Sequence, residues 1–137
     1  MSDEIKSYSK VAVLYGGSSS EREISLITGK AVFKSLKSEG VEVILIDTIE
    51  PFIEVLKTER VTHAWIALHG SDGEDGKIQS ILNMLNIKYT GSDPITCSIT
   101  MNKYFTKSIL KSNGFKTPEF MLVDSSTQYE NIIKELK

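Results

Sequence analysis

Two glycine-rich segments carry the side chains of this sequence that could bind a small molecule. Residues 69–76, the second glycine loop, read His-Gly-Ser-Asp-Gly-Glu-Asp-Gly and follow the apolar run 64–68. Residues 16–20, the first glycine loop, read Gly-Gly-Ser-Ser-Ser and follow the apolar run 11–15. A strand, a glycine-rich loop and then a helix is how a parallel α/β sheet builds a ligand site at the carboxyl ends of its strands. The pattern therefore predicts small-molecule chemistry.

The first glycine loop leads into a predicted helix, whose free N–H groups and dipole favour an anion. The loop lacks both the GxGxxG and the Walker pattern, so a tight turn with a serine cap is the plain alternative. Ser20 and Glu23 have the spacing of a capping box, which leaves Glu21 free at the sheet edge. Glu21 could meet a ligand there or complement the helix dipole, and the residues alone favour the dipole role.

The second glycine loop begins with His69, which could bind a carboxylate or orient a substrate near neutral pH. A hydrogen-bonded structural histidine is the alternative. Asp72, Glu74 and Asp75 stand close together but lack the wider spacing of a calcium loop. Lys103, at the start of a later predicted helix, is placed to reach a ligand.

Composition excludes several classes of protein. The chain has 137 residues, with 40% hydrophobic and 25% charged residues and a net charge of -2, which fits one average domain without a basic nucleic-acid footprint. Its apolar runs have the length of strands, and its polar start does not read as an export signal. The single cysteine, Cys97, rules out an internal disulfide and a cysteine zinc site. We expect a cytoplasmic protein with no membrane and no nucleic-acid partner.

Apolar strand-like runs alternate with helical patterns along the chain. The expected strands are residues 11–15, 41–46, 62–68 and 87–90, and the expected helices are residues 20–39, 78–85 and 102–112. Residues 52–56 are expected to form a short helix or a turn. This βαβαβαβα order predicts an α/β fold with a doubly wound, mainly parallel sheet and flanking helices.

The pattern restarts after Pro118 with an expected strand at residues 120–123. An amphipathic helix follows, with its apolar residues at Tyr129, Ile132, Ile133 and Leu136. One strand and one helix cannot bury their apolar faces alone. These residues are therefore predicted to open a second domain or to form a tail that packs elsewhere.

Four segments occur in an order that is more specific than any one of them. They are VLYGGSSSEREIS at residues 13–25, HGSDGEDGKIQS at 69–80, YTGS at 89–92 and MNK at 101–103. Together they resemble the amino-terminal part of D-alanine-D-alanine ligase, an ATP-grasp ligase. The resemblance implies a Rossmann-like pre-ATP-grasp domain over residues 1–116 that binds substrate. It also implies the truncated start of the central ATP-grasp domain at residues 117–137.

The resemblance assigns roles to four residues. Glu21 aligns with a catalytic and substrate-binding glutamate that orients the first D-alanine. His69 aligns with a histidine that lines the same site, and Glu74 with the loop acid that shapes it. Lys103 aligns with a lysine that contacts the nucleotide phosphates. The sequence departs from the family pattern at Asn102, where aspartate is usual.

The reaction implied by the resemblance joins two D-alanines through an acyl phosphate made with ATP, for peptidoglycan synthesis. The resemblance also implies magnesium as a cofactor and a homodimer. The magnesium carboxylates and the adenine pocket belong to domains for which this sequence has no room. Phosphoryl transfer depends on such positioned charges, so we expect the chain alone to be inactive. A non-catalytic binding or dimerisation module and the amino-terminal domain of another ATP-grasp ligase remain open alternatives.

Overall fold

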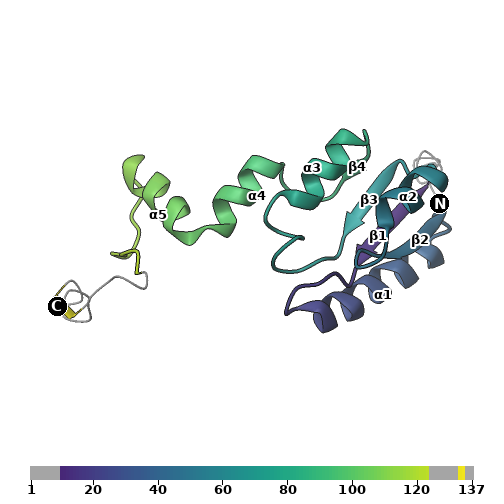
Figure 1. Ribbon diagram of the computed structural model, residues 1–137, viewed down its shortest axis with the longest axis horizontal. Helices are drawn as coiled ribbons and strands as arrows, with labels where there is room; N and C mark the ends of the chain where they lie inside the picture. The colour runs from purple at the N-terminus through teal and green to yellow at the C-terminus, as the bar shows by residue number, and fades with distance from the viewer. Residues whose placement is uncertain (1–9, 124–132, 135–137) are drawn as a thin grey trace. The chain divides into compact units, whose positions relative to one another are not determined.

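The computed structural model describes residues 10–123 and 133–134. The chain divides between Ser98 and Ile99 into two units, and each unit is described by itself. In the first unit, strands and helices alternate (Figure 1). The strands are β1 (Val11–Tyr15), β2 (Val43–Asp47), β3 (His63–Ile66) and β4 (Lys88–Tyr89), and the helices are α1 (Arg22–Ser38), α2 (Phe52–Thr58) and α3 (Lys77–Met84).

The four strands form one parallel sheet in the order β2-β1-β3-β4. The chain passes from β1 outward to β2 and then crosses back to β3, so the connections after β1 and β3 leave in opposite directions. Open parallel sheets bind ligands at such a switch point, outside the carboxyl ends of the two strands. The predicted doubly wound α/β fold is confirmed, and both glycine loops follow the two strands at the switch point.

Helices cover both faces of the sheet, as a buried parallel sheet requires. The side chains of Ala12 and Leu14 are fully buried on the face that α2 and α3 cover. The other buried members of this core are Ile46, Leu56, Val61, Ala64, Leu68, Ile78, Leu82 and Ile87. On the opposite face α1 packs closely, because Gly29 presents no side chain to Tyr15.

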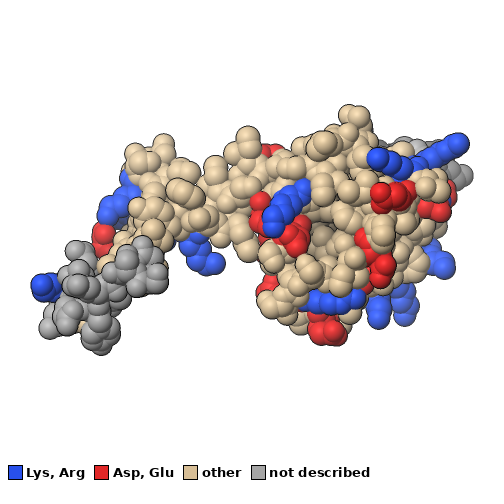
Figure 2. Space-filling model, in the orientation of Figure 1, with Lys and Arg blue, Asp and Glu red and all other residues tan. Residues whose placement is uncertain are grey.

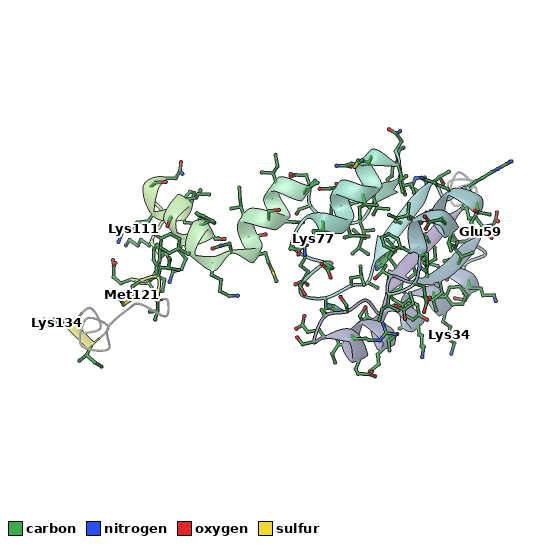
Figure 3. All side chains as sticks on the ribbon, viewed as in Figure 1. Lys34, Glu59, Lys77, Lys111, Met121 and Lys134 are labelled. Carbon is green, nitrogen blue, oxygen red and sulfur yellow. The ribbon has the colours of Figure 1, made fainter. Side chains whose placement is uncertain are left out.

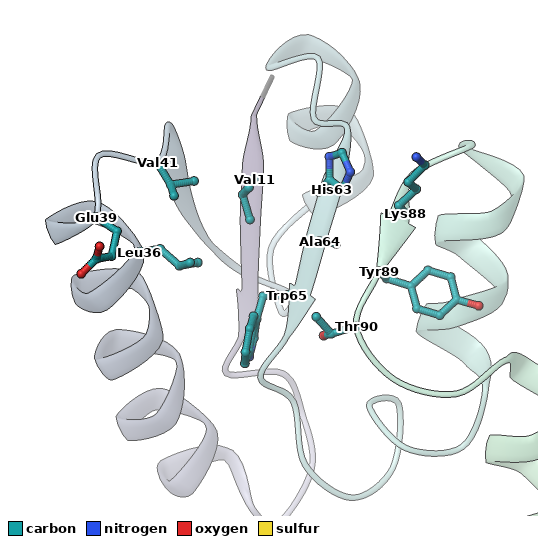
Figure 4. A pocket seen from close by; sticks show the side chains of 10 residues that line it. All are labelled: Val11, Leu36, Glu39, Val41, His63, Ala64, Trp65, Lys88, Tyr89 and Thr90. Atoms are coloured by element: carbon teal, nitrogen blue, oxygen red, sulfur yellow. The ribbon is translucent and has the colours of Figure 1, made fainter. Parts of the chain in front are cut away.

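An open groove of about 450 Å³ lies on the α1 side of the sheet (Figure 4). Its mostly apolar lining includes Trp65, which is 39% exposed. Its rim carries His63 and Lys88, the first residues of β3 and β4. The groove therefore lies toward the amino ends of the strands, away from the glycine loops.

The start of α1 differs from the prediction. The helix begins at Arg22 with Glu21 as its N-cap, and the side chain of Glu21 makes no capping hydrogen bond. The capping box predicted for Ser20 and Glu23 is therefore wrong. Ser19 binds the N–H groups at the start of the helix instead. Its hydroxyl accepts a hydrogen bond from the Glu21 N–H at 3.2 Å, and its carbonyl accepts one from the Arg22 N–H at 3.1 Å.

Sequence reasoning missed one helix, α4 (Pro94–Met101), which runs across the division between the units. The carboxylate of Asp93 accepts hydrogen bonds from the N–H groups of Ile95 and Thr96, at 3.0 and 3.1 Å. An acidic cap followed by proline is a helix start signal, and here it was present in the sequence.

The second unit contains α5 (Lys103–Ser112), which confirms the helix predicted for residues 102–112. The side chain of Asn102 caps it by accepting hydrogen bonds from the N–H groups of Tyr104 and Phe105, both at 3.1 Å. Asparagine thus fills the capping role that aspartate could also fill.

No strand forms at residues 120–123, so that prediction is wrong. An isolated strand has no ladder of hydrogen bonds to hold it. Of the amphipathic helix predicted after it, Ile133 lies in a described helical stretch, whereas Tyr129, Ile132 and Leu136 lie outside the described residues. The domain boundary placed between residues 116 and 117 stays a prediction.

The surface of the first unit mixes charges of both signs on the face drawn in Figure 2. Within the described ranges, none of the helices is long and apolar enough to cross a membrane.

Candidate functional site

The two glycine loops are joined by hydrogen bonds at the switch point of the sheet. The hydroxyl of Ser19 donates to the carbonyl of His69 at 2.7 Å, and the hydroxyl of Ser18 donates to the carboxylate of Asp72 at 3.1 Å. The buried Ser25 of α1 adds a third link between the ends of β1 and β3. Its hydroxyl donates to the carbonyl of Ala67 at 2.7 Å and accepts the N–H of residue 16 at 2.8 Å.

Glu21 stands where the loops meet. Its carboxylate lies over Gly70, because a Cβ atom added to Gly70 would come within 2.9 Å of the Glu21 Oε2 atom. Gly70 also has a φ of +69°, a conformation that residues with side chains rarely adopt. Among the described residues, the carboxylate of Glu21 makes no hydrogen bond or ion pair. An exposed carboxylate thus lies beside the second glycine loop.

His69 lies between α1 and the second glycine loop. Its Nε2 atom is 3.3 Å from the hydroxyl oxygen of Thr28, and its Nδ1 atom is 3.8 Å from the Oε1 atom of Glu74. The imidazole is about one-third exposed and the side chain of Glu74 about half exposed. The structure therefore brings Glu21, His69 and Glu74 to the carboxyl ends of β1 and β3, and their roles in binding stay predictions.

Internal bonds fix the shape of the second glycine loop. The carbonyl of Gly70 accepts the N–H of Glu74 at 2.9 Å, and the buried Gln79 donates through Nε2 to the carbonyl of Gly73 at 2.8 Å. Lys77, labelled in Figure 3, pairs with Asp72 at 2.7 Å. This hydrogen bond lowers the pKa of the Asp72 carboxyl. These contacts stabilise the loop around the exposed Glu74.

Asp72 and Asp75 both pair with Lys77, at 2.7 and 3.0 Å, which uses them in the loop itself. The described part of the chain contains no group of three His, Cys, Asp or Glu residues that could hold a metal ion. The acids of the second glycine loop therefore do not fit a magnesium site.

The glycine loops border a cavity of about 180 Å³. Its lining includes Ser18 and Asp72 from the loops and Phe52 from α2. Glu21 and His69 line neither this cavity nor the larger groove beside Trp65. Their side chains occupy an open edge of the sheet, where a ligand would need a further covering surface to leave water.

Lys103, the fourth predicted site residue, is the first residue of α5 in the second unit, and it is exposed. A lysine at a helix start is suited to phosphate as a point charge. Its role stays a prediction.

Sequence reasoning missed an ion pair beneath the first glycine loop. The Nη2 atom of Arg22 lies 2.6 Å from the Oδ2 atom of Asp47, at the end of β2. Hydrogen bonding to Arg22 lowers the pKa of the Asp47 carboxyl to about 2 against the opposing effect of burial, with help from the N–H groups of Ile49 and Gly17. No local motif announces the pair, because its members are 25 residues apart.

The low pKa of Asp47 predicts a pH-dependent contribution to stability. A carboxyl that titrates near 3.8 when unfolded and near 2 when folded stabilises the fold above the higher value. That contribution is lost as the pH falls through this window. The difference in free energy of unfolding between the wild type and Asp47→Asn should therefore be largest above pH about 4 and shrink toward pH about 2. Urea unfolding at a series of pH values measures it.

Arg22→Met provides the companion variant, because it removes the other member of the pair. Its difference from the wild type should shrink over the same pH window. A difference that stays constant with pH for both variants would show that the ion pair does not cause it.

Comparison with known proteins places this loop arrangement in a family. The family model described as "D-ala D-ala ligase N-terminus" matches residues 10–52 and 49–92, which include both glycine loops. The chain belongs to this family. The resemblance drawn from the sequence motifs is thereby confirmed.

Individual D-alanine-D-alanine ligases match nearly all of the chain. The one from Nitrosospira multiformis is 44% identical over 129 residues, which cover 94% of this chain and 42% of that protein. The one from Pelotomaculum thermopropionicum is 50% identical over 115 residues, which cover 84% of this chain and 36% of that protein. The chain thus spans about two-fifths of the length of these relatives.

A solved structure supports the same conclusion. The crystal structure of D-alanine-D-alanine ligase from Bacillus anthracis complexed with ATP superposes with a TM-score of 0.79 at 31% identity. The match covers 91% of this chain and 44% of that one. The parallel sheet with its flanking helices is therefore the fold of the corresponding part of that ligase.

Proposed function

We propose that this chain forms the part of a D-alanine-D-alanine ligase that binds the first D-alanine. The carboxylate of Glu21, held over Gly70 where the two glycine loops meet, is the observation that supports it most. An ammonium group placed there would form a charge-assisted hydrogen bond with Glu21. Glu21 would thereby bind and orient the amino acid for the reaction, which is the catalytic role expected of it.

His69 and Glu74 complete the proposed binding edge. The ring of His69 is placed by Thr28 and Glu74. A protonated nitrogen of this ring would donate a hydrogen bond to the carboxylate of D-alanine. Glu74 would keep the second glycine loop and the imidazole in place. These side chains shape and bind, and none of them is placed to transfer a phosphoryl group.

The complete ligase, in this proposal, joins two D-alanines with ATP through an acyl phosphate and supplies peptidoglycan synthesis. Lys103 would contact the phosphates of ATP as a point charge. When bound to the complete ligase, magnesium would supply the positive charge that neutralises the transferring phosphoryl group, and the described residues offer it no ligand cluster. We further propose a cytoplasmic homodimer whose partners include neither nucleic acid nor membrane.

Titration of the chain with D-alanine tests the role of Glu21. In ¹H–¹⁵N NMR spectra, the amide signals of His69 and Gly70 should shift as D-alanine binds. Glu21→Gln should weaken the affinity at least about tenfold, because a hydrogen bond to a charged group contributes about 1.5–3 kcal/mol. The dissociation constant from the titration is the measured quantity.

Glu23→Gln is the matched control, since Glu23 is an exposed carboxylate on the first turn of the same helix. It should bind D-alanine as the wild type does. Equal losses in both variants, or equal binding of L-alanine and D-alanine with shifts far from the loops, would refute the proposed site.

A further inference from the structure

The first glycine loop is held by a single ion pair that binds both the N–H and the carbonyl of one residue, Gly17. The Oδ1 atom of Asp47 accepts the N–H of Gly17 at 3.2 Å, while the Nη1 atom of Arg22 donates to the carbonyl of Gly17 at 2.9 Å. Arg22 and Asp47 also bind each other through two hydrogen bonds, at 3.0 and 2.6 Å. Such a bidentate ion pair fixes the relative orientation of the two side chains as well as the distance between them.

The register of the sheet delivers Asp47 to this position. Tyr15, the last residue of β1, pairs with Asp47, the last residue of β2, so the carboxylate stands beside the point where the first glycine loop begins. The space beside Gly16 is filled by the same pair. A Cβ atom added to Gly16 would overlap the carboxylate of Asp47 and lie 2.7 Å from the Nη1 atom of Arg22. The loop sequence and the ion pair therefore fit each other.

We propose that Arg22 and Asp47 are positioning residues that hold the first glycine loop and, with it, the carboxylate of Glu21 toward the ligand. Arg22 is the residue directly after Glu21, so a guanidinium fixed to the end of β2 fixes the backbone that carries Glu21. The N–H of Arg22 also donates to the carbonyl of Ser19, which closes the loop onto the helix. The part of this inference that concerns D-alanine rests on the proposed function.

Amide hydrogen exchange in the 137-residue chain tests the hold on the loop without any ligand. In Asp47→Asn, the amide of Gly17 should exchange at least about tenfold faster relative to the amide of Leu14. The reason is that the first glycine loop can then open locally while strand β1 stays closed. Arg22→Lys should do the same, since lysine keeps the charge but cannot reproduce the planar fork. An unchanged Gly17 amide, or equal acceleration of Gly17 and Leu14, would overturn the proposal.

Glu59→Gln is the matched control for these variants. It removes a pair of the same length, Lys10 with Glu59 at 2.6 Å, whose Lys10 end lies just before β1, at the opposite end of the sheet. The relative exchange of the Gly17 and Leu14 amides should stay as in the wild type. Acceleration of Gly17 alone in this control would mean that loss of any ion pair loosens the loop, which overturns the proposal.

The D-alanine titration separates positioning from the proposed function. Asp47→Asn and Arg22→Lys should weaken binding at least about threefold although they leave Glu21 in place. If Glu21→Gln weakens binding while neither variant does, the positioning role is refuted and the proposed function stands. If the wild type does not bind D-alanine, the proposed function fails, and the exchange of the Gly17 amide alone decides whether the pair holds the loop.

Discussion

Replacing Leu82 with alanine should lower the free energy of unfolding by about 3–4 kcal/mol, which is the usual cost of removing a fully buried leucine side chain. Leu82 is 0% exposed and belongs to the core between the sheet and the helices α2 and α3. Its neighbours in that core include Leu14 of β1 and Leu56 of α2. Deleting the side chain leaves a cavity that these rigidly held elements cannot fill. Chemical unfolding of the variant measures the loss.

Met84→Ala is the control on the same helix. The side chain of Met84 is 84% exposed, so its removal creates no cavity and should change stability by less than about 0.5 kcal/mol. A similar loss in both variants would mean that α3 is held by its length and not by its buried face.

Gly29→Ala should destabilise the chain by about 2 kcal/mol, the middle of the range for overpacking a tight core. An added Cβ atom would overlap the Cβ atom of Tyr15 and come within 2.9 Å of its Cγ and Cδ2 atoms. Alanine gains about 1 kcal/mol of helix propensity over glycine, which is less than the cost of forcing α1 away from the sheet. The nearest of these atoms, the Cβ atom of Tyr15, does not move when the side chain changes rotamer, so a rotamer change cannot relieve the overlap.

The same substitution in a Tyr15→Gly background identifies the cause. Glycine at position 15 lacks the Cβ atom as well as the ring, which removes all three close contacts, so Gly29→Ala should cost clearly less there than in the wild type. Equal costs in both backgrounds, measured by urea unfolding, would show that Tyr15 is not the obstacle.

The sheet was predictable from sequence because short continuous apolar runs such as residues 11–15 are typical of strands that are buried on both faces of a parallel sheet. Helix α5 was predictable for a similar reason, since its cap and its terminal glycine are local signals. Periodicity does not predict α4, because its residues, PITCSITM, show no clear apolar stripe, although an Asp-Pro start signal precedes it. Strong local sequence patterns were therefore sufficient to predict the elements of the fold in which they occur.

The loops and side chains of the candidate site were predictable from the sequence, whereas the contacts between them were not. The glycine loops, Glu21 and His69 were visible because unusual residue types follow strands. The capping box failed because the hydroxyl of Ser19 both caps the loop and binds the carbonyl of His69, a contact 50 residues away. The pair of Arg22 and Asp47 depends on the register between β1 and β2, which no single segment encodes. Tertiary contacts of this kind override local capping rules.

The partly exposed Trp65 is an intrinsic fluorescent probe that reports on one known region of the surface. It is the only tryptophan of the sequence, and it lines the groove on the α1 side of the sheet, while Glu21 and His69 do not. Indole emission moves to shorter wavelength when water is excluded, so intrinsic fluorescence will report a protein surface that covers this groove. A ligand as small as D-alanine at the glycine loops should leave that emission unchanged, and the two kinds of binding can be told apart in one unlabelled sample.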